Sequence, residues 1–220
     1  MSGLTRPLLR WHGGKWLLAP WIIEQFPLHR TYVEPFGGAA SVLLRKDRSY
    51  AEIYNDLDDE VVNLFRVLRG TDAEQLVELI RLTPFARAEF ELAYQYVTDP
   101  VERARRLLVR SFMGFGGGLG VNFRRTGFRS DSKKSGSTPT LDWRNYPPAL
   151  ASIVDRLCGV TVENKDATAL MRQHDAPDTL HYVDPPYLHE TRSGKLVGGQ
   201  PYHAYAHELS EEQHAQLLSA

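Results

Sequence analysis

The sequence Thr179-Leu180-His181-Tyr182-Val183-Asp184-Pro185-Pro186-Tyr187 decides the fold. An apolar, β-rich run leads into two prolines, which cannot continue a ladder of backbone hydrogen bonds. We therefore expect Asp184 and Tyr187 to lie at the carboxyl end of a strand. Because open α/β sheets bind their ligands at that end, the segment predicts an α/β fold with a ligand site at this point.

Three complementary groups follow this strand. Asp184 contributes a carboxylate, the two prolines leave backbone carbonyls free as acceptors, and Tyr187 contributes an aromatic face. These groups suit a planar ring with an exocyclic amine, because the oxygens accept from the amine while the tyrosine stacks on the ring. A nucleobase flipped out of its helix fits this description. The segment alone leaves open a strand that simply ends in a Pro-Pro turn with a buried tyrosine.

The composition is that of an ordinary globular protein. The 220 residues are 42% hydrophobic and 24% charged, which indicates one domain with room for an insertion. The net charge of -1 does not exclude nucleic-acid binding, since the placement of basic residues matters more than their sum. One cysteine, Cys158, excludes an internal disulfide framework. No long apolar run occurs, so we expect a cytoplasmic protein without membrane contact.

Two glycine turns come earlier in the chain. In the first, Gly13-Gly14 lets the backbone approach a ligand, flanked by Trp11 and Lys15. A flexible turn before a helix over residues 16–26 is the plainer explanation.

The second turn joins a β-type run to a helix. Glu34, Pro35 and Phe36 precede Gly37-Gly38, which is not a G-x-G-x-x-G dinucleotide motif. A carboxylate at Glu34 would repel a pyrophosphate and suits a positively charged ligand.

A second strand, over residues 50–54, ends at Asn55-Asp56. An acidic residue about twenty positions beyond a glycine turn can hold the ribose hydroxyls of an adenosine group. Asp56 can equally cap the helix that begins near Asp58 and continues to residue 69. Both roles stay open.

The middle of the chain reads as helices followed by a basic segment. Helical patterns cover residues 73–81, 85–97 and 101–113, and residues 114–140 are irregular and rich in glycine. Basic side chains alternate there with phenylalanines, which is typical of nucleic-acid contact. A solvated surface loop is the alternative. The candidate nucleic-acid-binding residues are Arg124, Arg125, Arg129, Lys133 and Lys134.

The sheet pattern resumes after residue 147. A helix over 148–157 precedes a strand over 160–164, with Asp166 at its end, and a short helix from Ala167 leads to the strand before Asp184. The capping box Ser210-Glu211-Glu212-Gln213 opens a last helix. His203 and His207 have helical spacing, but no third ligand is obvious, so we expect no metal.

Four motifs together resemble the Dam-type DNA adenine-N6 methyltransferases, and most closely their phage and prophage branch. They are Arg10-Trp11-His12-Gly13-Gly14-Lys15, Val33-Glu34-Pro35-Phe36-Gly37-Gly38-Ala39, Asn55-Asp56 and Asp184-Pro185-Pro186-Tyr187. Their order matches that of the family, and the resemblance covers nearly the whole chain.

The resemblance implies a Rossmann-like methyltransferase sheet, S-adenosyl-L-methionine as methyl donor and double-stranded DNA as substrate. It implies a catalytic domain in residues 1–72 and 147–220, with a mainly helical target-recognition region in residues 73–146. The implied cofactor-binding residues are Trp11, Lys15, Glu34, Phe36, Gly37, Gly38, Asp56, Asp166 and Asp184. The implied catalytic residues are Asp184, Pro185, Pro186 and Tyr187.

The chemistry needs placement more than reactivity. Hydrogen bonds from the adenine N6 amine to Asp184 and the Pro185 carbonyl raise the electron density on nitrogen. The methyl group then transfers in line, without a covalent intermediate or metal.

One departure from the family concerns the sheet. Four strands are predicted where the resemblance implies seven, so we expect missing C-terminal strands or a partner chain to complete the sheet. Two alternatives stay open: a catalytically weak remnant that binds cofactor or DNA, and methylation of another amine, on RNA adenine or cytosine N4. A role in restriction-modification or phage protection cannot be read from the sequence.

Overall fold

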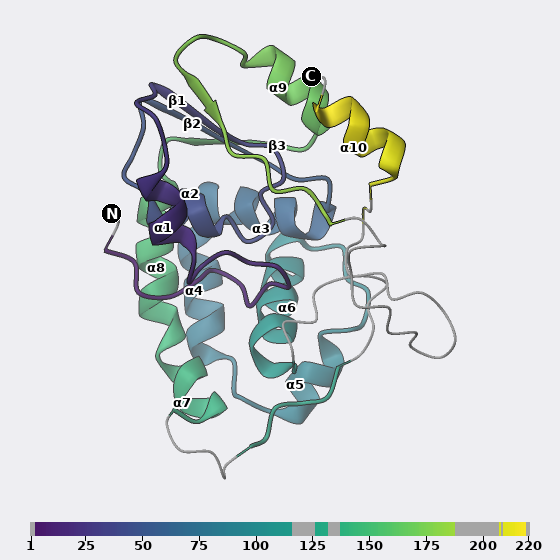
Figure 1. Ribbon diagram of the computed structural model, residues 1–220. Coiled ribbons are helices and arrows are strands. Elements are labelled where there is room, and N and C mark those ends of the chain that lie inside the picture. Colours follow the sequence, from purple (N-terminus) through teal and green to yellow (C-terminus); the bar gives the residue numbers. More distant parts are fainter. Residues whose placement is uncertain (1–2, 116–125, 132–136, 188–206, 208, 219–220) are drawn as a thin grey trace.

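The computed structural model describes residues 3–115, 126–131, 137–187, 207 and 209–218. Figure 1 shows a small sheet at one end of the molecule and a layer of helices extending away from it. Within the described ranges, no helix is long and apolar enough to cross a membrane.

All four predicted strands form, and they pair in parallel. They are β1 (Thr31–Glu34), β2 (Ala51–Asn55), β3 (Val160–Glu163) and β4 (Thr179–His181). Their order in the sheet is β3-β2-β1-β4, with Tyr32 opposite Glu52 and Val33 opposite His181. The mixed α/β architecture is the Rossmann-like one that the sequence predicts. Among the described residues β4 is an edge strand, and the completion of the sheet by further strands stays a prediction.

The two faces of the sheet are covered unequally. Val33 and Ile53 point to one face and pack on Leu170 of α9 (Ala167–Gln173). Tyr32 and Tyr54, of opposite parity, point to the other face, where the main hydrophobic core lies. Three helices supply much of this second layer: α2 (Ser41–Arg45), α3 (Asp59–Arg69) and α8 (Tyr146–Leu157).

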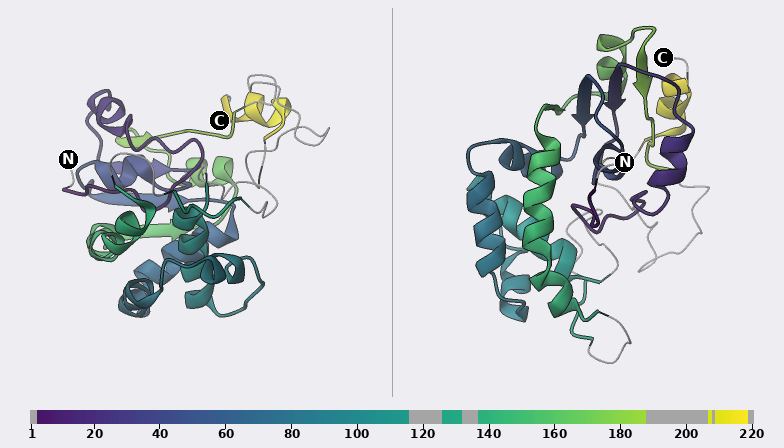
Figure 2. Two further views of the ribbon diagram at one scale, coloured as in Figure 1. Left: turned by 90° about the horizontal axis from the view of Figure 1, so that it is seen from below. Right: turned by 90° about the vertical axis from the view of Figure 1, so that its left-hand side faces the viewer.

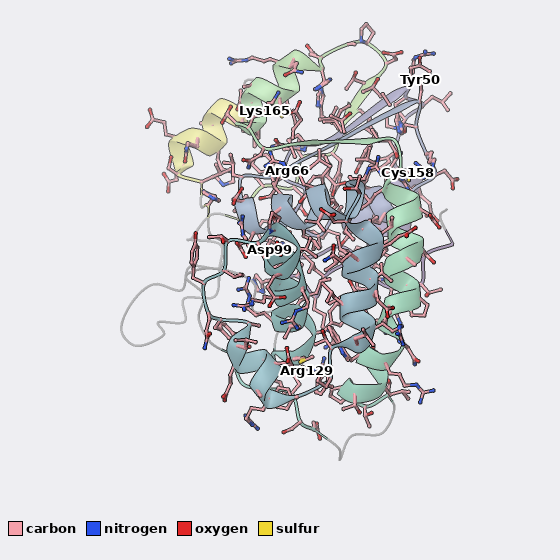
Figure 3. The ribbon with its side chains drawn as sticks, turned by 180° about the vertical axis from the view of Figure 1, so that it is seen from behind. Tyr50, Arg66, Asp99, Arg129, Cys158 and Lys165 are labelled. Atoms are coloured by element: carbon pink, nitrogen blue, oxygen red, sulfur yellow. The ribbon has the colours of Figure 1, made fainter. Side chains whose placement is uncertain are left out.

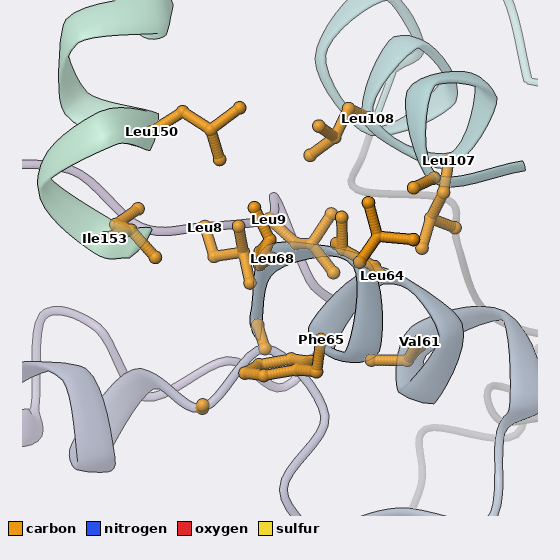
Figure 4. Close-up of a cluster of buried hydrophobic side chains, with 14 of the residues drawn as sticks. Leu8, Leu9, Val61, Leu64, Phe65, Leu68, Leu107, Leu108, Leu150 and Ile153 are labelled. Atoms are coloured by element: carbon orange, nitrogen blue, oxygen red, sulfur yellow. The ribbon is translucent and has the colours of Figure 1, made fainter. Parts of the chain in front are cut away.

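The helices of residues 73–146 share this core. They are α4 (Ala73–Leu82), α5 (Arg87–Leu92), α6 (Pro100–Met113) and α7 (Pro139–Arg144). Figure 4 shows leucines of α6 meeting those of α3, with Leu8 and Leu9 of the N-terminal segment between α3 and α8. The indole N–H of Trp143 donates to the Thr83 carbonyl (2.8 Å), and the Tyr146 hydroxyl donates to that of Leu8 (2.6 Å). The helical region is therefore continuous with the sheet layer, as the two further views in Figure 2 show.

Capping side chains fix several helix starts. Asp58 accepts from the Glu60 N–H (3.0 Å), so Asp58 and not Asp56 caps α3. The predicted capping box before α10 (Glu211–Leu218) is confirmed: the Gln213 N–H donates to Ser210 Oγ at 3.2 Å, and Gln213 Oε1 accepts from the Ser210 N–H at 2.8 Å.

Three helix predictions were wrong in extent. α1 (Ala19–Glu24) begins later than residue 16, because Pro20 fits only within a first turn. α5 ends at Leu92 instead of residue 97, and guanidinium groups of α6 take the carbonyls of Ala93 and Gln95 that follow it. α7 was not predicted, and only its first two residues fall within the segment predicted as irregular, residues 114–140. There Thr138 Oγ1 accepts from the Leu141 N–H (3.2 Å), and Pro139 occupies the first turn.

The basic residues of α6 serve the fold. Each of its four arginines forms an ion pair with an acidic side chain, and Arg105 and Arg110 are buried. Glu60 of α3 receives both Arg103 (2.7 Å) and Arg110 (3.1 Å). These arginines consequently bind α3 and α5 to α6.

A buried ion group lies between the sheet and α8. Glu52 accepts from Arg156 through both carboxylate oxygens (2.7 and 2.9 Å) and from Lys46 Nζ (2.7 Å). All three side chains are at most 6% exposed. Arg156 also donates to the Leu43 carbonyl (2.6 Å), so the group joins β2, α2 and α8.

Candidate active site

A cavity of about 700 Å³ lies at the carboxyl ends of the strands. It is positioned where the strand order reverses, since the chain continues from β1 to β2 on one side while β4 pairs on the other. Ligands of open α/β sheets bind at such a switch point. All nine predicted cofactor-binding residues line this cavity: Trp11, Lys15, Glu34, Phe36, Gly37, Gly38, Asp56, Asp166 and Asp184. Residues separated by as many as 173 positions are thus brought to one place.

The glycine turn after β1 forms one wall, and both glycines are required sterically. A Cβ at Gly37 would lie 2.1 Å from the Tyr54 ring, and one at Gly38 would lie 2.7 Å from Trp11 Nε1. Gly38 also has a positive φ of 47°. Asp56 Oδ2 accepts from the Gly38 N–H (2.7 Å) and so holds the turn against the end of β2.

Asn55 braces the strand ends. Its amide donates to the carbonyls of Pro35 (2.9 Å) and Lys165 (3.0 Å), and its oxygen accepts from the Lys165 N–H (2.9 Å). One side chain thereby fixes the segments that follow β1 and β3 relative to β2. This interaction places Glu34, Asp56 and Asp166 at a common rim.

Glu34 is a buried carboxyl in the cavity wall. Its Oε2 accepts from the Tyr32 hydroxyl (3.0 Å) and the Leu43 N–H (3.1 Å). Burial raises the pKa of Glu34 to about 8, although these two hydrogen bonds oppose the shift. A cation bound beside it would favour its ionised form.

We expect Glu34 to make the protein less stable as the pH rises. Because the pKa in the folded protein exceeds the ordinary value of 4.5, its contribution to the free energy of unfolding is complete below pH 4.5 and is lost as the pH approaches 8. A Glu34→Gln variant removes this titration. Relative to wild type, the variant should gain roughly 1.4 kcal/mol per pH unit at most within this window. Urea unfolding of both proteins at pH 5 to 8 measures this, and parallel stability profiles would contradict it.

Asp184 and Tyr187 are gathered around Lys15. Lys15 Nζ lies 2.5 Å from Asp184 Oδ2 and 5.2 Å from the centre of the Tyr187 ring. Pro186 lines the cavity, while Tyr187 is 50% exposed at its edge. The carboxylate and the aromatic ring therefore contact the same ammonium group, and Tyr187 itself is not among the residues that line the cavity.

The cavity carries an excess of acid. Among its described lining residues, five carboxyl groups meet two permanently cationic groups, those of Lys15 and Arg172. The carboxyl groups are Glu34, Asp56, Asp58, Asp166 and Asp184. Burial raises the pKa of Asp56 and of Asp58, which indicates a poorly solvated negative wall. Such a wall attracts a ligand with positive charge.

Sequence reasoning missed one side of the cavity. Arg172 of α9, His207, and Leu209, Gln213 and Leu217 in and before α10 also line it. Figure 1 shows α9 and α10 side by side at this end of the sheet. The capping box predicted α10 but not its position near α9, because that position depends on tertiary packing. The described residues contain no group of three or more histidine, cysteine, aspartate or glutamate side chains that could hold a metal ion.

The predicted nucleic-acid-binding segment, residues 114–140, is described at residues 114–115, 126–131 and 137–140. Arg124, Arg125, Lys133 and Lys134 lie outside the described residues. Arg129 lies near the end of α6 that is remote from the sheet (Figure 3). Its guanidinium donates to the Phe112 carbonyl (2.9 Å), and burial together with repulsion from Arg10 lowers its pKa. Contact of these five residues with DNA stays a prediction.

A short antiparallel bridge joins the start of this segment to its middle. Gly114 pairs with Phe128, the Phe115 N–H donates to the Gly127 carbonyl (3.1 Å), and the Arg129 N–H donates to that of Met113 (2.8 Å). Gly114 and Phe128 are therefore held beside each other, next to the end of α6.

Comparison with known proteins agrees with this geometry. Residues 11–220 match the model of the D12 class N6 adenine-specific DNA methyltransferases. The chain belongs to this family. The resemblance to the DNA adenine-N6 methyltransferases is thereby confirmed, since the match covers the four motifs from Trp11 onward. The phage and prophage branch stays a prediction.

Several proteins similar to this chain are named DNA adenine methylase. The one from Serratia marcescens is 26% identical over 97% of this chain and 82% of its own length, and the one from Haemophilus influenzae is 27% identical over 83% and 64%. The one from Escherichia coli (strain K12) is 30% identical over 54% of this chain and 45% of its own length. The match therefore spans about half the length of that last relative.

Proposed function

We propose that this chain methylates N6 of adenine in double-stranded DNA, with S-adenosyl-L-methionine as methyl donor. The observation that carries the proposal is the acidic cavity at the switch point of the sheet, with Asp184 at its rim. The relatives are named DNA adenine methylase, which supports the same substrate.

The residues of the cavity fit this donor. S-adenosyl-L-methionine supplies a methyl group on a cationic sulfonium centre and also carries an ammonium group, a carboxylate and a ribose. Glu34 and the wall beside it suit the positive charges, Lys15 suits the carboxylate, and Asp56 suits the ribose hydroxyls. Trp11, Phe36, Gly37, Gly38 and Asp166 would complete the binding site.

The base is held on the other side of Asp184. We assign the amine of the flipped adenine to the Asp184 carboxylate and the Pro185 carbonyl, and its ring to Tyr187. Pro185 and Pro186 lack N–H groups, so this backbone offers acceptors without competing donors. Two acceptors aligned on the amine favour transfer by positioning and by stabilising the positive charge that develops on nitrogen.

We assign target recognition to residues 73–146 and catalysis to residues 1–72 and 147–220. Arg124, Arg125, Arg129, Lys133 and Lys134 are the proposed DNA contacts in the first region. Substituting an arginine that reads guanine would relax specificity at one position of the target. Substituting one that binds phosphate would weaken binding to all sequences.

The direct test is transfer of labelled methyl from S-adenosyl-L-methionine to DNA, with the product nucleoside identified by mass spectrometry. N6-methyladenine is the expected product, and sequencing of methylated plasmid locates the target. If the product is N4-methylcytosine, the substrate is cytosine and not adenine. If methyl is transferred only to RNA, the substrate is RNA and not DNA. Cofactor binding without transfer to any nucleic acid would identify the chain as a binding remnant.

Tyr187 provides a second test. We expect Tyr187→Ala to lower kcat/KM about 10- to 100-fold, because base–aromatic stacking contributes roughly 1 to 3 kcal/mol. Tyr187→Phe keeps the ring and should stay close to wild type. Steady-state kinetics on the mapped target distinguishes the two variants, and an equal loss in both would contradict stacking.

A further inference from the structure

Lys15 contacts Asp184 and Tyr187, the two side chains that the proposed function assigns to the target base. Its ammonium is 2.5 Å from Asp184 Oδ2 and 5.2 Å from the centre of the Tyr187 ring. It also donates to the Gly13 carbonyl (2.9 Å). The Lys15 and Asp184 side chains are 17% and 23% exposed, so water screens their interaction only in part.

The ammonium and the base amine use the same interactions. Each donates N–H to the carboxylate, and each is attracted to the aromatic ring, one through cation–π contact and the other through stacking. Although burial alone would lower the pKa of Lys15, its hydrogen bonds to Asp184 and Tyr187 outweigh this and raise it. Lys15 is therefore charged at neutral pH, when Asp184 is its ion-pair partner.

Other acidic groups are poorly placed to draw Lys15 away. Glu34, whose pKa of about 8 leaves it mostly protonated at neutral pH, accepts from Tyr32 and Leu43. Asp56 accepts from the N–H groups of Gly38 and Asp58. The carboxylate of the donor's methionine group would be a different case, because a donor held in this cavity would share it with the Gly13-Gly14 turn and Lys15, which line it.

We propose that Lys15 competes with the target amine for Asp184, and that the donor's carboxylate releases Asp184 by taking Lys15 as its own partner. The base then enters productively only after the donor is bound. This inference rests on the proposed function and adds an order of binding to it. It makes Lys15 a positioning residue that couples the two halves of the site.

The test uses a duplex with 2-aminopurine at the adenine that plasmid sequencing identifies. Its fluorescence rises when the base leaves the stack. Wild type, Lys15→Met and Lys15→Arg are titrated with and without saturating S-adenosylhomocysteine, which has the carboxylate but no methyl to transfer. Circular dichroism melting verifies that each variant is folded.

For wild type and Lys15→Arg, we expect base extrusion to be about tenfold or more favourable with S-adenosylhomocysteine than without it. Lys15→Met should extrude the base without S-adenosylhomocysteine, so that this ratio falls close to one. An unchanged ratio in Lys15→Met, or a wild-type signal that does not depend on S-adenosylhomocysteine, would overturn the inference. Absence of methyl transfer by wild type would instead be a failure of the proposed function.

Discussion

Replacing Asp184 with alanine should reduce methyl transfer by on the order of 10³-fold, as removal of a preorganised polar group from a reacting centre does. The reason is specific to the chemistry, since the N6 amine loses the carboxylate that accepts its hydrogen bond. Lys15 also loses its ion-pair partner, but it keeps the Gly13 carbonyl and partial access to water. The fold should therefore survive, and DNA binding should persist.

The measurement is single-turnover methyl transfer on the mapped target, with DNA affinity determined in parallel. Asp155→Ala is a matched control, because Asp155 is an exposed aspartate on α8 and does not line the cavity. Methyl transfer near the wild-type rate in Asp184→Ala would remove Asp184 from the reaction.

Replacing Glu52 with glutamine should lower the free energy of unfolding by roughly 3 to 5 kcal/mol. Glu52 is the carboxylate shared by Lys46 and Arg156, and all three side chains are buried. Glutamine keeps the shape but leaves two buried cations without a counter-charge. The loss is a large share of the total stability of an ordinary domain.

Urea unfolding measures this change, and Glu78→Gln is the matched control. Glu78 pairs with Arg81 on the exposed face of α4, so its replacement should leave the unfolding midpoint within experimental error. An equal effect of both substitutions would show that the buried group is not responsible.

The acid side of the stability profile should also depend on Glu52. Burial would raise the pKa of Glu52, but hydrogen bonds from Arg156 and Lys46 outweigh it and lower the pKa. Its contribution is then present above the ordinary value of 4.5 and is lost as the pH falls below it. Glu34 acts in the opposite direction, so the two carboxyls should displace the wild-type profile at different ends of the pH range.

Local chemistry made the strands and several helix starts predictable. The run before Asp184 predicted a strand, and β4 forms there, although it ends at His181, with one further hydrogen bond from the Tyr182 N–H to the Val33 carbonyl (2.8 Å). Ser210 and Gln213 specify α10 through groups only three residues apart. Much of the cavity lining was predictable because three of the four motifs lie at the ends of strands of one parallel sheet, whose carboxyl ends share an edge. Cofactor binding by these residues stays a prediction.

Contacts between distant residues account for what was not predicted. α5 is short because carbonyls that follow it are taken by arginines of α6, and no local pattern reveals this. Arg172 and Gln213 reach the cavity because the fold brings both α9 and α10 to its wall. The raised pKa of Glu34 likewise depends on α2 and β1 enclosing it together.

The bridge between Gly114 and Phe128 has a consequence for how such a protein can diversify. Its backbone hydrogen bonds involve Met113, Phe115, Gly127 and Arg129 and fix both ends of the intervening segment beside each other. A change in the length of that segment therefore leaves these backbone hydrogen bonds in place. Evolution can exchange the sequence between these ends without repacking α6, and an engineer can graft a foreign segment at the same two positions.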